Sequence, residues 1–238
     1  MVNSSLLDSL SFFINRSPVF VFSIAVLAFG VVIGLYLLLE WLRHGKQYKF
    51  PLYWAIGLFL FYWFQIPFIL ANAGVHFTVT DFNIFYALTL PTIFGGLMLI
   101  YLGVLSVLQP PHIKKIKFWL FLWLVACFLF FFYYLVVRGG VIDNHSSVLV
   151  VNLLFFVPAR LLILFALWRW LRLQNWQKTK ATIFGIILMM GWAVVGIAGN
   201  IFAIKKLLIY PPQFWFIALT EFELMFLLQS ASMLLLVL

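Results

Sequence analysis

Three charged residues lie inside apolar stretches of the chain: Arg160 in one stretch, and Glu221 and Glu223 in another. A charge at the centre of a bilayer costs about 2.5–3.5 kcal/mol on insertion scales, so such residues are rare and are usually paired or functional. At the rise of an α-helix, Arg160 lies about 18 Å into its stretch, and the glutamates lie about 11 and 14 Å into theirs. An arginine side chain can bridge that difference in depth. The spacing therefore predicts an ion pair between Arg160 and one glutamate.

Two interpretations of these charges stay open. Residues two apart on a helix point about 200° away from each other, so only one of Glu221 and Glu223 can face Arg160 well. The other glutamate must face a cavity or another helix, or be protonated. One interpretation is a structural ion pair that fixes two helices against each other. The other is a binding or proton-coupled site, and it is favoured because three charges cannot cancel as one neutral pair.

Polar residues and prolines gather at a similar depth. Pro67, Pro91 and Pro158 each remove one backbone hydrogen bond and free a carbonyl near Trp63, Ala87 and Leu154, respectively. Kinked helices around polar residues can enclose a water-filled pocket, although interhelical hydrogen bonds alone would also explain them. We expect a ligand-binding pocket that is lined by Arg160, Glu221, Glu223, Asn152, Asn200, Gln65, Thr89 and Thr220.

The composition places these residues in a membrane. Hydrophobic residues make up 66% of the 238 residues and charged residues 9%, with a mean hydropathy of +1.15, so a soluble domain is excluded. The apolar runs are continuous rather than alternating, which favours helices over a β-barrel. We predict an all-α polytopic membrane protein, 1–238, as a single domain of seven transmembrane helices. The predicted spans are about 19–41, 51–71, 84–107, 117–137, 148–170, 181–203 and 214–236.

The net charge of +9 is a signal of topology rather than of nucleic-acid binding. Ten of the basic residues fall on one side of the predicted spans, in the connections after spans one, three and five. Basic connections face the cytoplasm, so the N-terminus is expected outside and the C-terminus in the cytoplasm. No signal peptide is predicted in 1–17. We expect an integral protein of a bacterial or archaeal inner (cytoplasmic) membrane, with the lipid bilayer as its first partner.

Short matches recur at a nearly constant offset. Trp41-Leu42-Arg43 matches Trp170-Leu171-Arg172, Gly57 matches Gly185, Asn72 matches Asn200, and Ala87-Leu88-Thr89 matches Ala218-Leu219-Thr220. These matches predict a parallel 3+1+3 repeat, with units 1–108 and 148–238 joined by a linker helix at 117–137. This plan resembles that of SWEET-type sugar transporters, PnuC-type vitamin transporters and rhodopsin-like proteins. The sequence has no Pro-Gln pair in span one or five, and span seven has no lysine for a retinal Schiff base.

Other chemistry is not expected. No histidine lies within a span, and no nucleophile–histidine arrangement lies in the membrane, so we expect no haem, no other cofactor, no metal site and no enzyme activity. Cys127 is expected to be a buried thiol. The small-xxx-small pattern of Gly30 and Gly34, and the glycines Gly191 and Gly196, predict close internal packing.

The favoured function is a seven-helix sensory or receptor-like module that binds a small or lipophilic ligand in an outward-facing pocket between helices five and seven. In this hypothesis Arg160 binds an anionic or hydrogen-bond-accepting group, and a cytoplasmic output domain or partner follows helix seven. The alternatives are a small-solute or proton-coupled transporter and a structural subunit of a membrane complex. The inner half of the spans has few polar residues, which favours sensing over transport.

Overall fold

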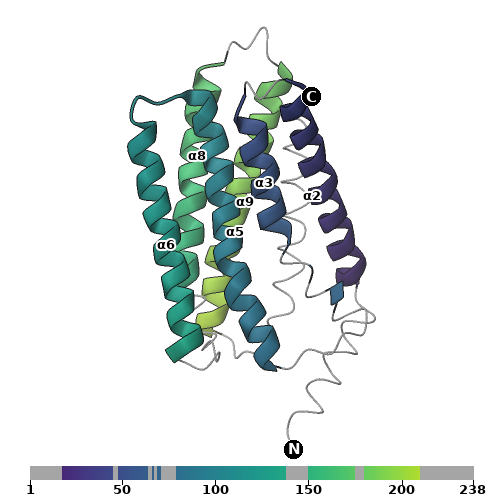
Figure 1. The fold of residues 1–238 in the computed structure, drawn as a ribbon, viewed down its shortest axis with the longest axis vertical. Helices are drawn as coiled ribbons and strands as arrows, with labels where there is room; N and C mark the ends of the chain where they lie inside the picture. The colour runs from purple at the N-terminus through teal and green to yellow at the C-terminus, as the bar shows by residue number, and fades with distance from the viewer. Residues whose placement is uncertain are drawn as a thin grey trace, which may run out of the picture.

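The computed structural model describes residues 18–44, 48–63, 66, 69–70, 79–137, 150–174 and 180–209, and all regular secondary structure in these residues is helical. Six of the predicted spans overlap described helices, although the second, 51–71, does so with a helix that ends at Tyr62, and the predicted seventh span, 214–236, lies outside the described residues. The helices are α2 (Pro18–Arg43), α3 (Phe50–Tyr62), α5 (Val79–Leu108), α6 (Ile113–Val137), the π-helical segment η1 (Asn152–Phe156), α8 (Val157–Arg172) and α9 (Lys180–Ile209) (Figure 1).

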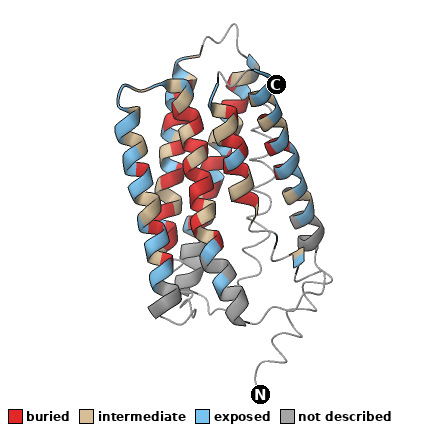
Figure 2. Ribbon diagram, in the orientation of Figure 1, coloured by how far each residue is buried: buried red, intermediate tan, exposed pale blue. Residues whose placement is uncertain are grey.

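Membrane embedding is confirmed by helix length and composition. Among the described residues, three segments are long and apolar enough to cross a membrane: Leu88–Leu108, Ile113–Tyr133 and Asn152–Arg172. Much of α6 is exposed, as Figure 2 shows in pale blue. Its exposed residues include large apolar ones such as Trp119, which is 67% exposed. Such a surface is costly in water but not in hydrocarbon. The number of spans and the orientation in the membrane stay predictions.

The helices form a bundle around α3, α5 and α8. Helix α3 packs between α2 and α5, α5 also contacts α6 and α8, and α8 contacts α9. The C-terminal ends of α2, α5 and α8 lie at the same end of the bundle, at the top of Figure 1. We call this the basic end, because it carries Arg43, Lys49, Lys114, Lys115, Lys117, Arg169, Arg172 and Lys180.

Glycines bring α3 close to both of its neighbours. A Cβ atom at Gly30 would overlap the Tyr62 ring, and one at Gly34 would lie 2.7 Å from Cε1 of Phe59. A Cβ atom at Gly96 of α5 would lie 2.7 Å from the carbonyl oxygen of Gly57. The predicted internal packing of the Gly30–Gly34 pattern is therefore confirmed.

The predicted repeat is only partly covered by the described helices. Helices α2 and α3 are neighbours, as are α8 and α9, which the repeat would make equivalent. Gly57 and Gly185 are both buried. The equivalent of α5 would be the seventh span, so the repeat stays a prediction.

Candidate functional site

Arg160 is buried between α8 and α9, where it contacts a backbone carbonyl. Its side chain is 4% exposed, and Nη1 donates a hydrogen bond of 2.6 Å to the carbonyl oxygen of Gly196. Its guanidinium carbon lies 5.7 Å from the ring centroid of Trp192, within the range of a cation–π interaction. Its Nε has no hydrogen-bond partner, and among the described residues no carboxylate pairs with it. The positive charge of Arg160 is therefore not neutralised by any described side chain.

The contact of Arg160 with α9 depends on the absence of a side chain at position 196. A Cβ atom at Gly196 would lie 2.7 Å from Cζ of Arg160, 2.8 Å from its Nε and 2.8 Å from its Nη1. A helical carbonyl oxygen has a second lone pair, so that of Gly196 can accept from Arg160 as well as from its own helix. Glycine is thus required for the guanidinium to lie against the backbone of α9.

Three residues of α9 form one polar face toward the interior of the bundle. Trp192, Gly196 and Asn200 are spaced four residues apart, so they lie on the same side of the helix, and all three are buried. Nε1 of Trp192 and both Nδ2 and Oδ1 of Asn200 are buried and have no hydrogen-bond partner among the residues that the structure describes. Each buried polar group left unpaired costs about 1–3 kcal/mol, so this face has unused binding capacity.

The unpaired atoms favour an acceptor as their partner. Arg160 Nε, Trp192 Nε1 and Asn200 Nδ2 are donors, and Asn200 Oδ1 is the single acceptor. From Trp192 to Asn200 the face extends about 12 Å along the helix axis. A carboxylate or another group rich in acceptor oxygens would satisfy these donors and also balance the charge of Arg160.

The carbonyl freed by Pro158 is engaged by a neighbouring helix. The chain forms the π-helical segment η1 just before α8, and Pro158 follows at the second residue of α8. Nε1 of Trp123 in α6 donates a hydrogen bond of 3.2 Å to the carbonyl oxygen of Leu154. This bond is consistent with the prediction that Pro158 leaves the Leu154 carbonyl without a backbone donor. The carbonyl joins the run of η1 and α8 to α6 and does not line the polar face of α9.

Thr89 belongs to a different set of contacts. It is buried in α5, two residues before Pro91, and its carbonyl oxygen accepts a hydrogen bond of 2.7 Å from the hydroxyl of Thr92. The Thr92 hydroxyl in turn accepts from Nε1 of Trp63, at the end of α3. This network joins α5 to α3, whereas Arg160 joins α8 to α9.

The other predicted site residues divide into two groups. Asn152 is buried at the first position of η1, on the same helical run as Arg160 and about two turns away. Four predicted residues lie outside the described residues: Gln65, Thr220, Glu221 and Glu223. The predicted ion pair between helices five and seven is therefore not tested.

Sequence reasoning missed Trp192 and the role of Gly196 in the site. The spacing of Trp192, Gly196 and Asn200 was available as a signal, because it places them on one helical face.

Comparison with known proteins identifies no relative: no protein-family model matches the chain, and no curated protein or solved structure matches it.

Proposed function

We propose that the chain is a receptor-like membrane module that binds a small ligand through an acceptor group on the polar face between α8 and α9. The observation that carries this proposal is the set of buried atoms of Arg160, Trp192 and Asn200 that have no hydrogen-bond partner in the described part of the chain. Burying four such atoms without a use would cost several times about 1–3 kcal/mol. A ligand that supplies acceptor oxygens recovers that free energy only when it binds.

Each residue has a role in this proposal. Arg160 donates Nε–H to a carboxylate of the ligand while Nη1 stays on Gly196. Trp192 and Asn200 donate from the two ends of the face. The seventh span completes the site: one of Glu221 and Glu223 balances Arg160 when no ligand is bound, and the other relays a proton or faces the pocket. Asn152, Gln65 and Thr220 line its remaining surface, whereas Thr89 belongs to the network between α3 and α5.

Helix α8 offers a route for a signal. Arg160 lies about 15 Å along α8 from Trp170, near the basic end. The Trp170 ring lies 6.4 Å from that of Trp54, centroid to centroid, and Nε1 of Trp54 donates a hydrogen bond of 3.0 Å to the carbonyl of Ile100 in α5. A ligand that moves Arg160 would therefore move a contact between α8 and α3. This coupling, with the basic end in the cytoplasm, supports a sensory role.

The test is a thermal-unfolding screen of the purified protein in detergent with short- and medium-chain carboxylic acids. A ligand at one hundred times its Kd stabilises the folded state by about 2.7 kcal/mol. We expect a stabilising acid whose effect disappears in Arg160→Gln and persists in Gly191→Ala, because a Cβ atom at Gly191 meets no atom within 4 Å. The absence of any stabilising acid would contradict the proposal.

A substitution at Asn200 distinguishes a role in ligand binding from a purely structural role. Asn200→Leu removes two unpaired polar atoms, so we expect it to stabilise the ligand-free protein while weakening the response to the acid. A structural role predicts the opposite, a loss of stability. Flux of the acid through the protein in liposomes would favour the transporter alternative over a receptor.

A further inference from the structure

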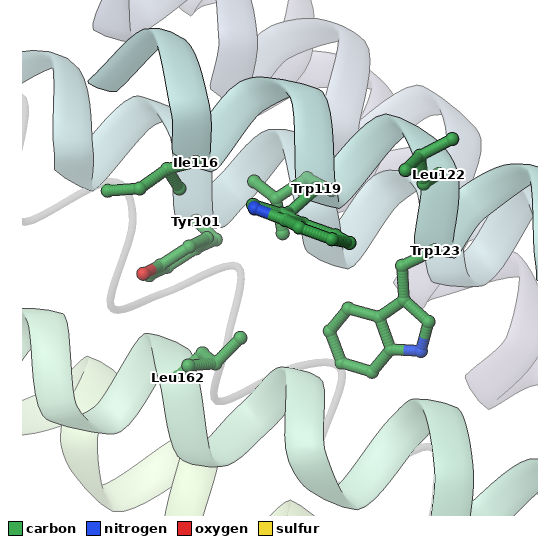
Figure 3. Close-up of a pocket in the computed structure, with 7 residues that line it drawn as sticks. Tyr101, Ile116, Trp119, Leu122, Trp123 and Leu162 are labelled. Atoms are coloured by element: carbon green, nitrogen blue, oxygen red, sulfur yellow. The ribbon is translucent and has the colours of Figure 1, made fainter. Parts of the chain in front are cut away.

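A cavity separate from the polar face of α9 opens on the outer surface of the bundle. It is an apolar groove of about 620 Å³ between α5, α6 and α8. Its walls include Tyr101 of α5, Ile116, Trp119, Leu122 and Trp123 of α6, and Leu162 of α8 (Figure 3). Helix α6 is the least buried of the three membrane-length segments, and it forms one edge of the bundle in Figure 1. The groove therefore faces the hydrocarbon of the membrane.

Tyr101 places one polar atom in this apolar groove. The residue is only 8% exposed, and its hydroxyl oxygen points along the groove toward the end that holds Ile116 (Figure 3). In the part of the chain that the structure describes, this hydroxyl makes no hydrogen bond, and its oxygen is open to the groove rather than fully enclosed. The hydroxyl of a largely buried tyrosine usually has a partner, so an occupant of the groove with an acceptor oxygen would supply it.

Exposed lysines lie next to the same end of the groove. Lys114 and Lys115 directly precede Ile116 at the start of α6, on the basic end of the bundle, and both are exposed. Lys117 is engaged elsewhere, because its Nζ lies 3.3 Å from the Tyr53 hydroxyl and 5.7 Å from the Tyr53 ring centroid. The two free lysines therefore offer positive charge to a headgroup at the mouth of the groove.

We propose that this groove binds one anionic phospholipid. An acyl chain lies against Trp119, Trp123 and Leu162, an ester carbonyl accepts a hydrogen bond from Tyr101, and the phosphate faces Lys114 and Lys115. The order of the α6 lysines, the α5 hydroxyl and the apolar wall along the groove matches the order of headgroup, ester and chain in a phospholipid. From Ile116 to Trp123 the wall extends about 10 Å, enough for the upper part of an acyl chain. A neutral apolar ligand would leave the lysines and the hydroxyl unused.

The test is native mass spectrometry of the full chain, delipidated in detergent and titrated with palmitoyl-oleoyl phosphatidylglycerol or phosphatidylcholine. We expect one retained lipid, with phosphatidylglycerol bound more tightly. Each lysine near an anionic lipid contributes about fivefold in affinity, so Lys114→Gln with Lys115→Gln should weaken phosphatidylglycerol about 25-fold and leave phosphatidylcholine unchanged. Tyr101→Phe should weaken both lipids about fivefold.

A filling variant tests the groove itself. Leu162→Trp should weaken both lipids at least about tenfold, whereas Leu129→Trp, on the 62% exposed outer face of α6, should change neither. If Leu162→Trp does not fold, the lysine and Tyr101 variants carry the test. Arg160→Gln should retain the lipid, so failure at the polar face of α9 and failure here are distinguishable.

Three results would overturn the proposal. The first is that phosphatidylglycerol and phosphatidylcholine bind equally well to the wild type, and that the double lysine variant binds both lipids as the wild type does. The second is lipid binding that is unaffected when the groove is filled or the Tyr101 hydroxyl is removed. The third is a wild-type dimer that dissociates in Leu162→Trp, which would identify a second copy of this chain as the occupant.

Discussion

Arg160 lies against the backbone of α9 and donates a hydrogen bond to a main-chain carbonyl oxygen rather than to a side chain. This arrangement determines which substitutions its neighbours can accept. The hydrogen bond to the Gly196 carbonyl neutralises no charge, so the guanidinium keeps its capacity for an anion. The adjacent indole of Trp192 stabilises the cation through its ring face without competing for that anion. The combination holds the arginine in place and leaves its charge available.

The first prediction compares two glycines of α9. Gly196→Ala should destabilise the protein by about 1–3 kcal/mol, because the added Cβ overlaps the buried guanidinium. Gly191→Ala meets no atom within 4 Å and should be neutral or stabilise the helix by about 0.5–1 kcal/mol. Thermal unfolding of both variants in detergent measures the difference. Equal effects would show that Arg160 does not lie on the backbone at position 196.

The second prediction identifies the counter-charge of Arg160. Arg160→Leu should cost about 3–5 kcal/mol if it leaves Glu221 or Glu223 buried without a partner. A double variant that combines Arg160→Leu with leucine at the glutamate that pairs with Arg160 should recover most of that loss. A double variant with leucine at the other glutamate should not. Unfolding of the single and double variants gives the coupling free energy. If the triple leucine variant keeps ligand binding, the charges are structural and the proposed site is wrong.

At the scale of the elements, each close helix contact depends on one specific atom or on one missing side chain. Helix α6 is tied to the run of η1 and α8 by the Trp123–Leu154 hydrogen bond, beside a proline that cannot supply an N–H group. Helix α3 approaches α5 at Gly57 and Gly96, where the two backbones nearly touch. These contacts set the positions of α8 and α5, and hence of the polar face and the groove.

The third prediction tests the bond between α6 and η1. Trp123→Phe should lower the free energy of unfolding by about 1–3 kcal/mol, since it removes the N–H group that the Leu154 carbonyl uses. Trp119→Phe on the same helix is the control, because Trp119 is 67% exposed. Unfolding in detergent without added phospholipid makes the comparison. A larger loss in Trp119→Phe would contradict the assignment.

The fourth prediction concerns neighbouring glycines of α5. Gly96→Ala should destabilise by about 1–3 kcal/mol, because its Cβ would lie 2.7 Å from the Gly57 carbonyl oxygen and 3.1 Å from the Phe61 nitrogen, both backbone atoms that cannot turn away. Gly95→Ala meets only leucine methyl groups, at 3.7 and 3.9 Å, and should be nearly neutral. Equal unfolding temperatures for the two variants would show that α3 and α5 are further apart.

The sequence predicted where the helices lie along the chain better than it predicted which face of each helix contacts its neighbours. The apolar stretches predicted where the described helices lie. Because Arg160, Asn152, Asn200 and Thr89 lie within those stretches, their burial could also be predicted. Helices that are apolar all round carry no amphipathic stripe, so the sequence could not indicate which face of α9 meets α8. For the same reason the hydrogen bond between Trp63 of α3 and Thr92 of α5, and the α5–α6–α8 groove, were not foreseen.

At the scale of the whole molecule, charge and apolar surface are arranged along the bundle axis. The C-terminal ends of α2, α5 and α8 share the basic end, and large apolar side chains cover the outer face. Basic residues collect on the cytoplasmic side of membrane proteins, which supports the proposed orientation with the N-terminus outside.

The fifth prediction tests this orientation in intact cells. A membrane-impermeant maleimide should label Ser146→Cys, in the connection between predicted spans four and five, without permeabilisation. It should label Lys115→Cys only after permeabilisation, because Lys115 lies at the basic end. Cys127 is fully buried and is the only cysteine of the chain, so the wild type is the unlabelled control. The reverse pattern of labelling would invert the topology.

The use of a main-chain oxygen at Gly196 has a consequence for how this protein can diverge. No substitution can delete that acceptor, and every substitution adds at least one carbon atom where the guanidinium lies. Tolerance at position 196 is therefore governed by volume alone: serine should be as poorly tolerated as alanine, despite its hydroxyl. In a saturation library selected for folded protein, position 196 should retain glycine, while position 191, five residues away on the same helix, should accept many residue types.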